Sequence, residues 1–164
     1  YEDGIVPTAE AVARLLTLLR RKFNHIVVDL PSPPPPSMRQ VLTVARQRVV
    51  VLGPDITSLR DTLAARRLCT RLGVPRVITV LNRAGGAGAL KPALITEGLG
   101  AAPDVMIPDL SHHLPRAANL GKVALPKVGA LRRALEPLTL EVSGVRVGAA
   151  SRSGKSLLSW LSRS

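Results

Sequence analysis

Residues 48–58 read Arg-Val-Val-Val-Leu-Gly-Pro-Asp-Ile-Thr-Ser, and this stretch decides the fold class. An unbroken run of valine and leucine is typical of a strand that is covered on both faces. Gly53 and Pro54 end the run, and Asp55 and Ser58 are residue types that favour the start of a helix. The stretch therefore predicts a buried strand that leads directly into a helix.

The same alternation extends along most of the chain. Strands are expected at residues 25–30, 48–53, 77–81 and 105–107, and helices at 9–23, from 55 to Gly73, at 92–99, 114–120 and 128–138. Short Val/Ile strands that alternate with helices indicate βαβ units with right-handed crossovers. We therefore expect an α/β fold in three layers (α/β/α) with a mainly parallel sheet. Residues 1–140 would form this domain, and 141–164 a basic Ser/Gly tail.

Composition narrows the class of protein. Apolar residues make up 46% of the 164 residues but aromatic residues only 2%, so the core must consist of aliphatic side chains. No apolar run reaches the roughly 18 residues of a membrane-spanning helix, and no secretory leader follows Tyr1. The single cysteine, Cys69, lies on the apolar stripe of its helix, which favours core packing over catalysis and suits a reducing compartment.

The net charge of +12 predicts affinity for polyanions such as nucleic acid, anionic lipid or phosphorylated ligands. The alternative is an ordinary protein with an arginine-rich surface. No aromatic residues are interleaved with the arginines, so the support for nucleic-acid binding is weak.

Polar residues follow three of the expected strands. They are Asp29 with Leu30 and Pro31, Asn82 with Arg83, and Pro108 with Asp109. Ligands of parallel sheets bind beyond the carboxyl ends of the strands, so the coincidence favours a binding site there.

Each of these residues has a functional and a purely structural interpretation. A carboxylate at Asp29 occupies the position of a Walker B acid, which holds Mg²⁺ through a water, or it merely caps the end of a strand. The amide of Asn82 complements the edge of adenine and Arg83 can stack on a base, or both belong to a tight turn before the following glycines.

Two other motifs are weaker. His112 and His113 lack the Cys/Glu neighbours of a metal site, which favours a surface turn. Residues 148–156, Gly-Ala-Ala-Ser-Arg-Ser-Gly-Lys-Ser, have one residue too many between their glycines for a Walker A loop. Residues 156–161, with their basic neighbours, suit a short amphipathic anchor for anionic lipid, and a disordered tail is the alternative.

Four motifs together resemble the MinD/ParA-like (SIMIBI) ATPases, and most closely their CpaE/TadZ branch, which positions Flp (Tad) pilus machinery. They are Phe-Asn-His-Ile-Val-Val-Asp-Leu-Pro, Arg-Val-Val-Val-Leu-Gly-Pro-Asp-Ile-Thr-Ser-Leu-Arg-Asp-Thr, Arg-Val-Ile-Thr-Val-Leu-Asn-Arg-Ala-Gly and the stretch 105–122. The resemblance covers roughly residues 5 to 126.

The resemblance implies a role for each site residue. Asp29 would be the Walker B acid and Mg²⁺ ligand, and Leu30 and Pro31 would open switch II. Asn82 and Arg83 would contact adenine, and the turn at Pro108 and Asp109 would close over it. ATP would lie at a homodimer interface in a cytoplasmic protein, at the inner membrane or a cell pole, whose partners are pilus or secretion proteins.

The chain also departs from the family. The phosphate-binding loop of the family precedes the Walker B strand, and no such loop stands before Asp29. We therefore expect a fragment of a longer protein, in which the parent hydrolyses ATP weakly and this chain alone is inactive. Pro33 to Pro36 would stiffen switch II, and Val123 stands where relatives often have proline. The alternatives are a ParA-type partitioning ATPase that binds DNA non-specifically and a pseudo-ATPase scaffold.

Overall fold

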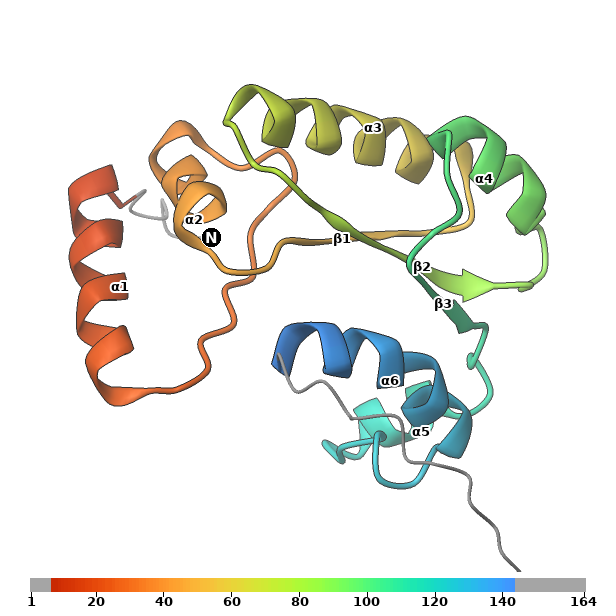
Figure 1. Ribbon diagram of the computed structural model, residues 1–164. Helices are drawn as coiled ribbons and strands as arrows, with labels where there is room; N and C mark the ends of the chain where they lie inside the picture. Colours follow the sequence, from red (N-terminus) through yellow and green to blue (C-terminus); the bar gives the residue numbers. More distant parts are fainter. Residues whose placement is uncertain (1–6, 144–164) are drawn as a thin grey trace, which may run out of the picture.

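A parallel sheet between two layers of helices forms the centre of the molecule (Figure 1). The computed structural model describes residues 7–143. Strands β1 (Val49–Leu52), β2 (Ile78–Ala84) and β3 (Val105–Pro108) lie side by side in that order, and both pairs are parallel. Helices α3 (Ile56–Arg71) and α4 (Pro92–Leu99) cover one face, and α5 (Leu114–Asn119) and α6 (Gly129–Ser143) lie on the other. The predicted three-layer α/β/α class is confirmed for these residues.

Each face of the sheet has its own aliphatic core. On the α6 side, Ile78, Val80, Val105 and Ile107 are buried against the apolar stripe of that helix. On the α3/α4 side, Leu52 and Leu81 pack with Ile95 and Leu99. Leu81 and Ile95 have no exposed surface. As the composition predicts, burial of these aliphatic groups is the main stabilising force, worth about 1.5–3 kcal/mol for each large side chain.

Helix α3 begins and ends where the sequence indicates. The side chain of Asp55 accepts a hydrogen bond from the amide of Ser58 at 2.8 Å and so caps the first turn. Gly73 has a φ of +71°, the left-handed conformation that glycine adopts at the end of a helix. Between these ends Cys69 is buried, as predicted, and burial raises the pKa of its thiol.

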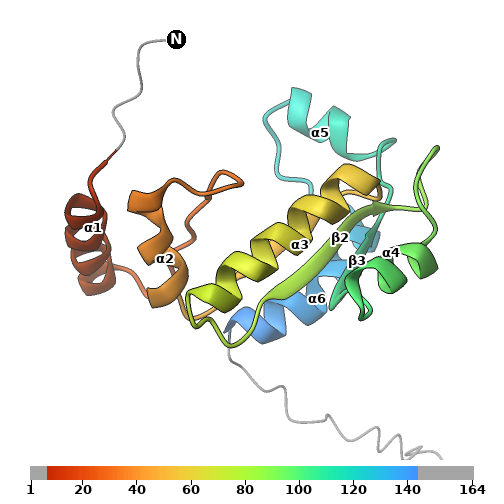
Figure 2. The same ribbon diagram turned by 90° about the horizontal axis from the view of Figure 1, so that it is seen from above.

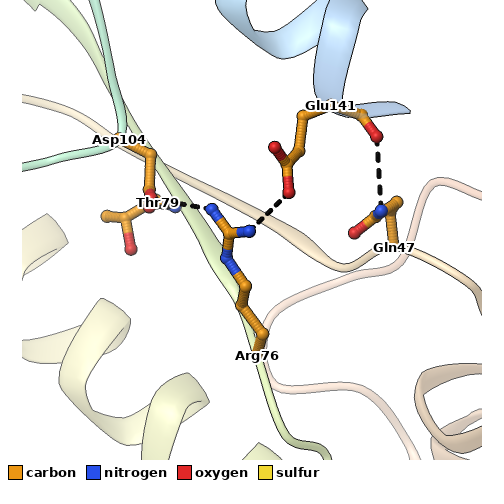
Figure 3. A network of polar contacts seen from close by, with 5 residues as sticks. All are labelled: Gln47, Arg76, Thr79, Asp104 and Glu141. Carbon is orange, nitrogen blue, oxygen red and sulfur yellow. Dashed lines mark hydrogen bonds and ion pairs between the residues drawn. The ribbon is translucent and has the colours of Figure 1, made fainter. Parts of the chain in front are cut away.

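A polar network holds α6 against the amino ends of the strands (Figure 3). Arg76 forms ion pairs with Asp104 and Glu141, and the carboxylate of Asp104 accepts a hydrogen bond from the amide of Thr79 at 2.7 Å. Gln47 donates to the carbonyl of Glu141 at 3.3 Å. Helix α6 runs through Pro137 and continues past the predicted end at Leu138 to Ser143.

Residues 7–44 contain a group of helices that lies beside the sheet (Figure 2). Helix α1 (Ala9–Lys22) agrees with the prediction, and Thr8 caps it. The 3₁₀ helix η1 (Pro36–Met38) and helix α2 (Arg39–Val44) were not expected, because the proline run before them favours extended chain. The proline at the start of η1 is nevertheless in a position that helices tolerate.

The predicted strand at 25–30 is wrong for this structure. These residues are extended, but they pair with no strand, and no backbone hydrogen bond joins them to another described residue. Val27 is 93% exposed. An apolar β-type sequence gains a strand's stability only when a neighbouring strand supplies hydrogen bonds and a covered face, and the described chain offers neither.

Within residues 7–143, no helix has both the length and the apolar character needed to cross a membrane. The predicted lipid anchor and the GKS-containing stretch lie outside the described residues.

Candidate base-binding site at the carboxyl edge of the sheet

The loops that follow the three strands are joined to one another by backbone hydrogen bonds. Leu90, in the loop after β2, donates its amide to the carbonyl of Pro54 after β1 at 2.8 Å. Asp109, after β3, donates to the carbonyl of Ala84 at the end of β2 at 2.9 Å. The three strand ends thus form one connected edge, where a parallel sheet places its ligands.

Asn82 and Arg83 form an irregular step at the end of β2. The pairing of β2 with β3 shifts register between Leu81 and Ala84, and Arg83 has a φ of +59°. The side-chain oxygen of Asn82 accepts a hydrogen bond from the amide of Arg83 at 3.0 Å. A bulge of this kind re-aims side chains at the end of a strand, and here it leaves the Arg83 side chain exposed.

The structure at Asn82 and Arg83 contains the tight turn that was one interpretation of the sequence, and it is also compatible with the other, contact with a base. A left-handed residue does lie before the glycines, but it is Arg83, for which this conformation is costly, and not Asn82. Residues with strained backbone conformations cluster at functional sites. Asn82 is partly buried, and within residues 7–143 its side-chain NH₂ group donates no hydrogen bond.

Asp109 forms a compact turn against the glycine loop. Its carboxylate accepts hydrogen bonds from the amide of Ser111 at 3.1 Å and from the Ser111 hydroxyl at 3.0 Å. A Cβ placed on Gly86 would lie 3.1 Å from the Asp109 carboxylate, so a larger residue would require this side chain to shift. The turn therefore lies against the loop that directly follows Asn82 and Arg83.

Gly53 plays a similar part after β1. A Cβ at this position would lie 2.7 Å from the Asp55 carboxylate that caps α3. The hydrogen bonds that Asp55 accepts from Ser58 lower the pKa of its carboxyl group. Sequence reasoning missed both Gly53 and Gly86 as site residues, and the only available signal was a glycine next to a polar strand end.

The structure brings together four of the predicted site residues, Asn82, Arg83, Pro108 and Asp109. Asp29, Leu30 and Pro31 lie elsewhere. In Figure 1 their extended segment is on the left, beside α1 and α2, whereas β2 and β3 end on the right. The catalytic and magnesium roles of Asp29 stay predictions.

Acidic and histidine side chains form no metal centre in the described part of the chain, where no three of them gather. A Mg²⁺ ion on a nucleotide needs only one or two carboxylates, with phosphates and waters as its other ligands.

Known proteins share this fold. A protein described as septum site-determining protein MinD, from Emiliania huxleyi, is 24% identical over 126 residues, which are 70% of this chain and 44% of the relative. A ParA family ATPase from Chlorobium tepidum TLS superposes with a TM-score of 0.68 at 22% identity, covering 79% of this chain and 55% of that one. The MinD cell division protein of Aquifex aeolicus gives 0.63 at 18% identity, with 85% and 60% covered. No protein-family profile matches.

The chain spans about half the length of the relatives that it matches. Over that length, its sheet and the helices on both faces have the fold of the MinD and ParA ATPases.

Proposed function

We propose that this chain supplies the base-binding half of an ATP site in a MinD/ParA-type protein of Flp/Tad pilus assembly or secretion. The observation that carries the proposal is the connected carboxyl edge, where the strained step at Asn82 and Arg83 lies against the turn at Asp109. Amide and guanidinium groups on a fixed loop suit the edge and the flat face of adenine.

Phosphate and magnesium binding would complete the site. In this proposal, Asp29 holds Mg²⁺ through a water once its segment lies in a sheet, with Leu30 and Pro31 after it. Magnesium would neutralise phosphate charge, and the loop that cradles the phosphates comes from sequence outside the described residues. The described chain alone is therefore expected to bind nucleotide weakly and not to hydrolyse it.

The pilus role rests on the motif resemblance, most of all on residues 54–61 and 107–121. It implies a homodimer with ATP at the interface, and pilus or secretion proteins as partners. The expected location is the cytoplasm, at the inner membrane or a cell pole, and the tail would add weak contact with anionic lipid. The fold likeness to a ParA family ATPase is equally compatible with partitioning on DNA.

Two titrations test the base site. Calorimetry with Mg-ATP should detect no micromolar binding, because the phosphate cradle contributes most of the affinity in such sites. Millimolar adenosine, followed by amide chemical shifts, should move the signals of Asn82, Arg83 and Asp109, whereas uridine should not. Asn82→Ala should abolish the adenosine shifts and the matched exposed variant Asn119→Ala should keep them. Shifts that are equal for adenosine and uridine, or that survive Asn82→Ala, would refute the base site.

Further measurements separate the other functions. A DNA-binding partitioning protein would bind duplex DNA with an affinity that falls steeply as salt rises. A pseudo-ATPase scaffold would be disproved by a longer form of the protein that hydrolyses ATP and loses this activity with Asp29→Ala.

A further inference from the structure

A cleft of about 320 Å³ lies between the proline segment before η1 and helix α3. Residues 32–34 form one wall. The other wall is formed by positions of α3 that recur at helical spacing: Asp61, Ala64, Ala65, Leu68 and Arg71. Figures 1 and 2 both show the loop before α2 beside the end of α3. The cleft is thus separate from the candidate base site at the carboxyl edge of the sheet.

The middle of the cleft is apolar. On the α3 wall, Ala64 and Ala65 contribute only methyl groups, and Leu68 adds a larger aliphatic group. On the opposite wall, the rings of Pro33 and Pro34 restrict the backbone, so this wall is stiff. Sites for small molecules have mainly apolar walls with a few polar groups and begin at about 300 Å³. The cleft therefore has the character of such a site and suits a small ligand.

Three charged side chains line the same cleft, namely Arg39, Asp61 and Arg71. The Nε of Arg39 donates a hydrogen bond to the carbonyl of Pro34 at 3.3 Å, and within the described chain its terminal amino groups donate none. The side chains of Asp61 and Arg71 form no hydrogen bond or ion pair with another described residue. Two cations and one anion are therefore available to a ligand, with a net charge of +1.

The arrangement of these charges selects the ligand. Asp61 and Arg71 are ten residues apart on α3, or about 15 Å at the rise of a helix. Guanidinium groups bind carboxylates through charge-assisted hydrogen bonds. A second negative charge would meet Asp61, and like charges in contact oppose binding. The cleft therefore favours a monoanion over polyphosphates or nucleic acid.

We propose that the cleft binds a small aliphatic carboxylic acid. Arg39 and Arg71 hold its carboxylate, and its hydrocarbon chain lies along Ala64, Ala65 and Leu68. The small volume favours a free acid over the carboxyl terminus of a peptide. Because the two walls belong to residues 32–39 and to α3, the bound acid joins the helices beside the sheet to a helix that covers the sheet.

Four probes separate the contribution of charge from that of the hydrocarbon chain. Octanoate has both features, octylammonium has the opposite charge, octanol has no charge, and acetate has no chain. Each is titrated below its micelle concentration into the full 164-residue chain at neutral pH, and amide chemical shifts are followed. Octanoate should give saturable shifts at Ala64, Ala65 and Leu68, with a dissociation constant of roughly millimolar order for so small a ligand. The other probes should bind at least about threefold more weakly.

Arginine variants test the carboxylate contacts. Arg39→Gln should weaken octanoate binding by about fivefold, because Arg39 is partly buried. Arg71→Gln should weaken it by about twofold, because water screens this exposed side chain. Arg67→Gln is the matched control, since Arg67 is also exposed on α3 but does not line the cleft, and it should leave octanoate binding unchanged.

Two further variants keep the test valid if Arg39→Gln disturbs the proline segment. Ala64→Leu should abolish octanoate binding by filling the cleft, whereas Ala93→Leu, at an exposed position of α4, should not. Asp61→Asn should strengthen octanoate binding by about twofold, because it removes a like charge. Circular dichroism confirms that each variant is folded.

Three results would overturn the proposal: no saturable octanoate shifts at the cleft, equal affinity for octanoate and octylammonium, or octanoate binding that survives Ala64→Leu. A leucine dipeptide with a free carboxyl terminus tests the other source of the same chemistry. If it binds more tightly than octanoate and its amidated form does not bind, the cleft recognises a chain terminus, and the proposed free acid is wrong. None of these titrations contains nucleotide, so failure of the base site would not affect them.

Discussion

The amide of Asp109 donates a hydrogen bond to the carbonyl of Ala84 across 2.9 Å, and this bond fixes the loop after β3 against the end of β2. Through it, the turn that Asp109 forms with Ser111 and the strained step at Arg83 become parts of one rigid edge. Substitutions at this edge should therefore affect stability and ligand binding in separable ways.

Gly86→Ala should disturb the edge without changing its charge. The added methyl group would lie 3.1 Å from the Asp109 carboxylate, so this side chain must shift within its turn, and we expect a loss of at most about 1 kcal/mol in the free energy of unfolding. Adenosine binding should weaken with it. Gly129→Ala is the matched control, because its Cβ would meet only Arg133 at 3.5 Å, and it should leave stability unchanged or raise it. The melting temperatures of both variants are measured by thermal unfolding. If Gly86→Ala is as stable as Gly129→Ala, the close contact at Gly86 is contradicted.

Arg83→Gly should stabilise the fold while it weakens base binding. Glycine adopts a φ of +59° without the cost of about 1 kcal/mol that an L-residue carries there. Arg83→Ala removes the same guanidinium but keeps the backbone strain. Urea unfolding should therefore separate the two variants by about 1 kcal/mol, whereas adenosine titration should find both impaired. A glycine variant that is no more stable than the alanine variant would show that the conformation is not strained.

The contribution of Asp55 to the stability of the fold should decrease as the solution becomes acidic. Its pKa is lowered in the folded chain by the hydrogen bonds from Ser58. A group with a lowered folded pKa stabilises the fold above its unfolded value, which is near 3.8, and this contribution is lost as pH falls through the folded pKa.

The measurement compares melting temperatures of the wild type and Asp55→Asn between neutral pH and about pH 2. Their difference should be largest near neutrality and should shrink in acid. Asp61→Asn, an exposed substitution on the same helix, serves as the control for the loss of one carboxylate. A constant difference for Asp55→Asn would mean that its charge contributes nothing beyond the cap.

Arg76→Ala should loosen α6 by a modest amount. The Arg76 side chain is 59% exposed, so water screens its ion pairs with Asp104 and Glu141, and the loss should be about 1 kcal/mol or less. Asp104→Ala should cost more, because it also leaves the Thr79 amide without its acceptor. Arg67→Ala, at an exposed position of α3, is the control. Urea unfolding measures the stability loss of each variant and so tests this ranking. High salt should reduce the loss caused by Arg76→Ala, because it screens the ion pairs.

Sequence reasoning predicts the sheet and its helices well, because apolar runs such as 48–53 and caps such as Asp55 and Gly73 act locally. It fails at 25–30, where an apolar run marks a strand only if a neighbour is present to pair with it. It also misses α2, whose six residues carry no cap and no clear periodicity.

The site is predicted in part for the same reason. Asn82, Arg83, Pro108 and Asp109 stand at strand ends that parallel pairing must bring together. The roles of Gly53 and Gly86 depend on how closely separate loops approach, and spacing along the chain does not reveal that distance. Asp29 lies in a segment that pairs with no described strand, and the apolar pattern of that segment does not reveal this.

The unpaired stretch at residues 25–30 has a further consequence for how the molecule responds to proteases. Extended chain without hydrogen bonds fits a protease cleft readily, whereas the strands and their connecting helices do not. A single cut there would sever α1 from a fragment that retains all three strands. Among the described residues, helix α1 would then be held by its packing on η1 and α2 and by the hydrogen bond from Arg20 to the carbonyl of Val44, whereas the larger fragment would keep both aliphatic cores of the sheet.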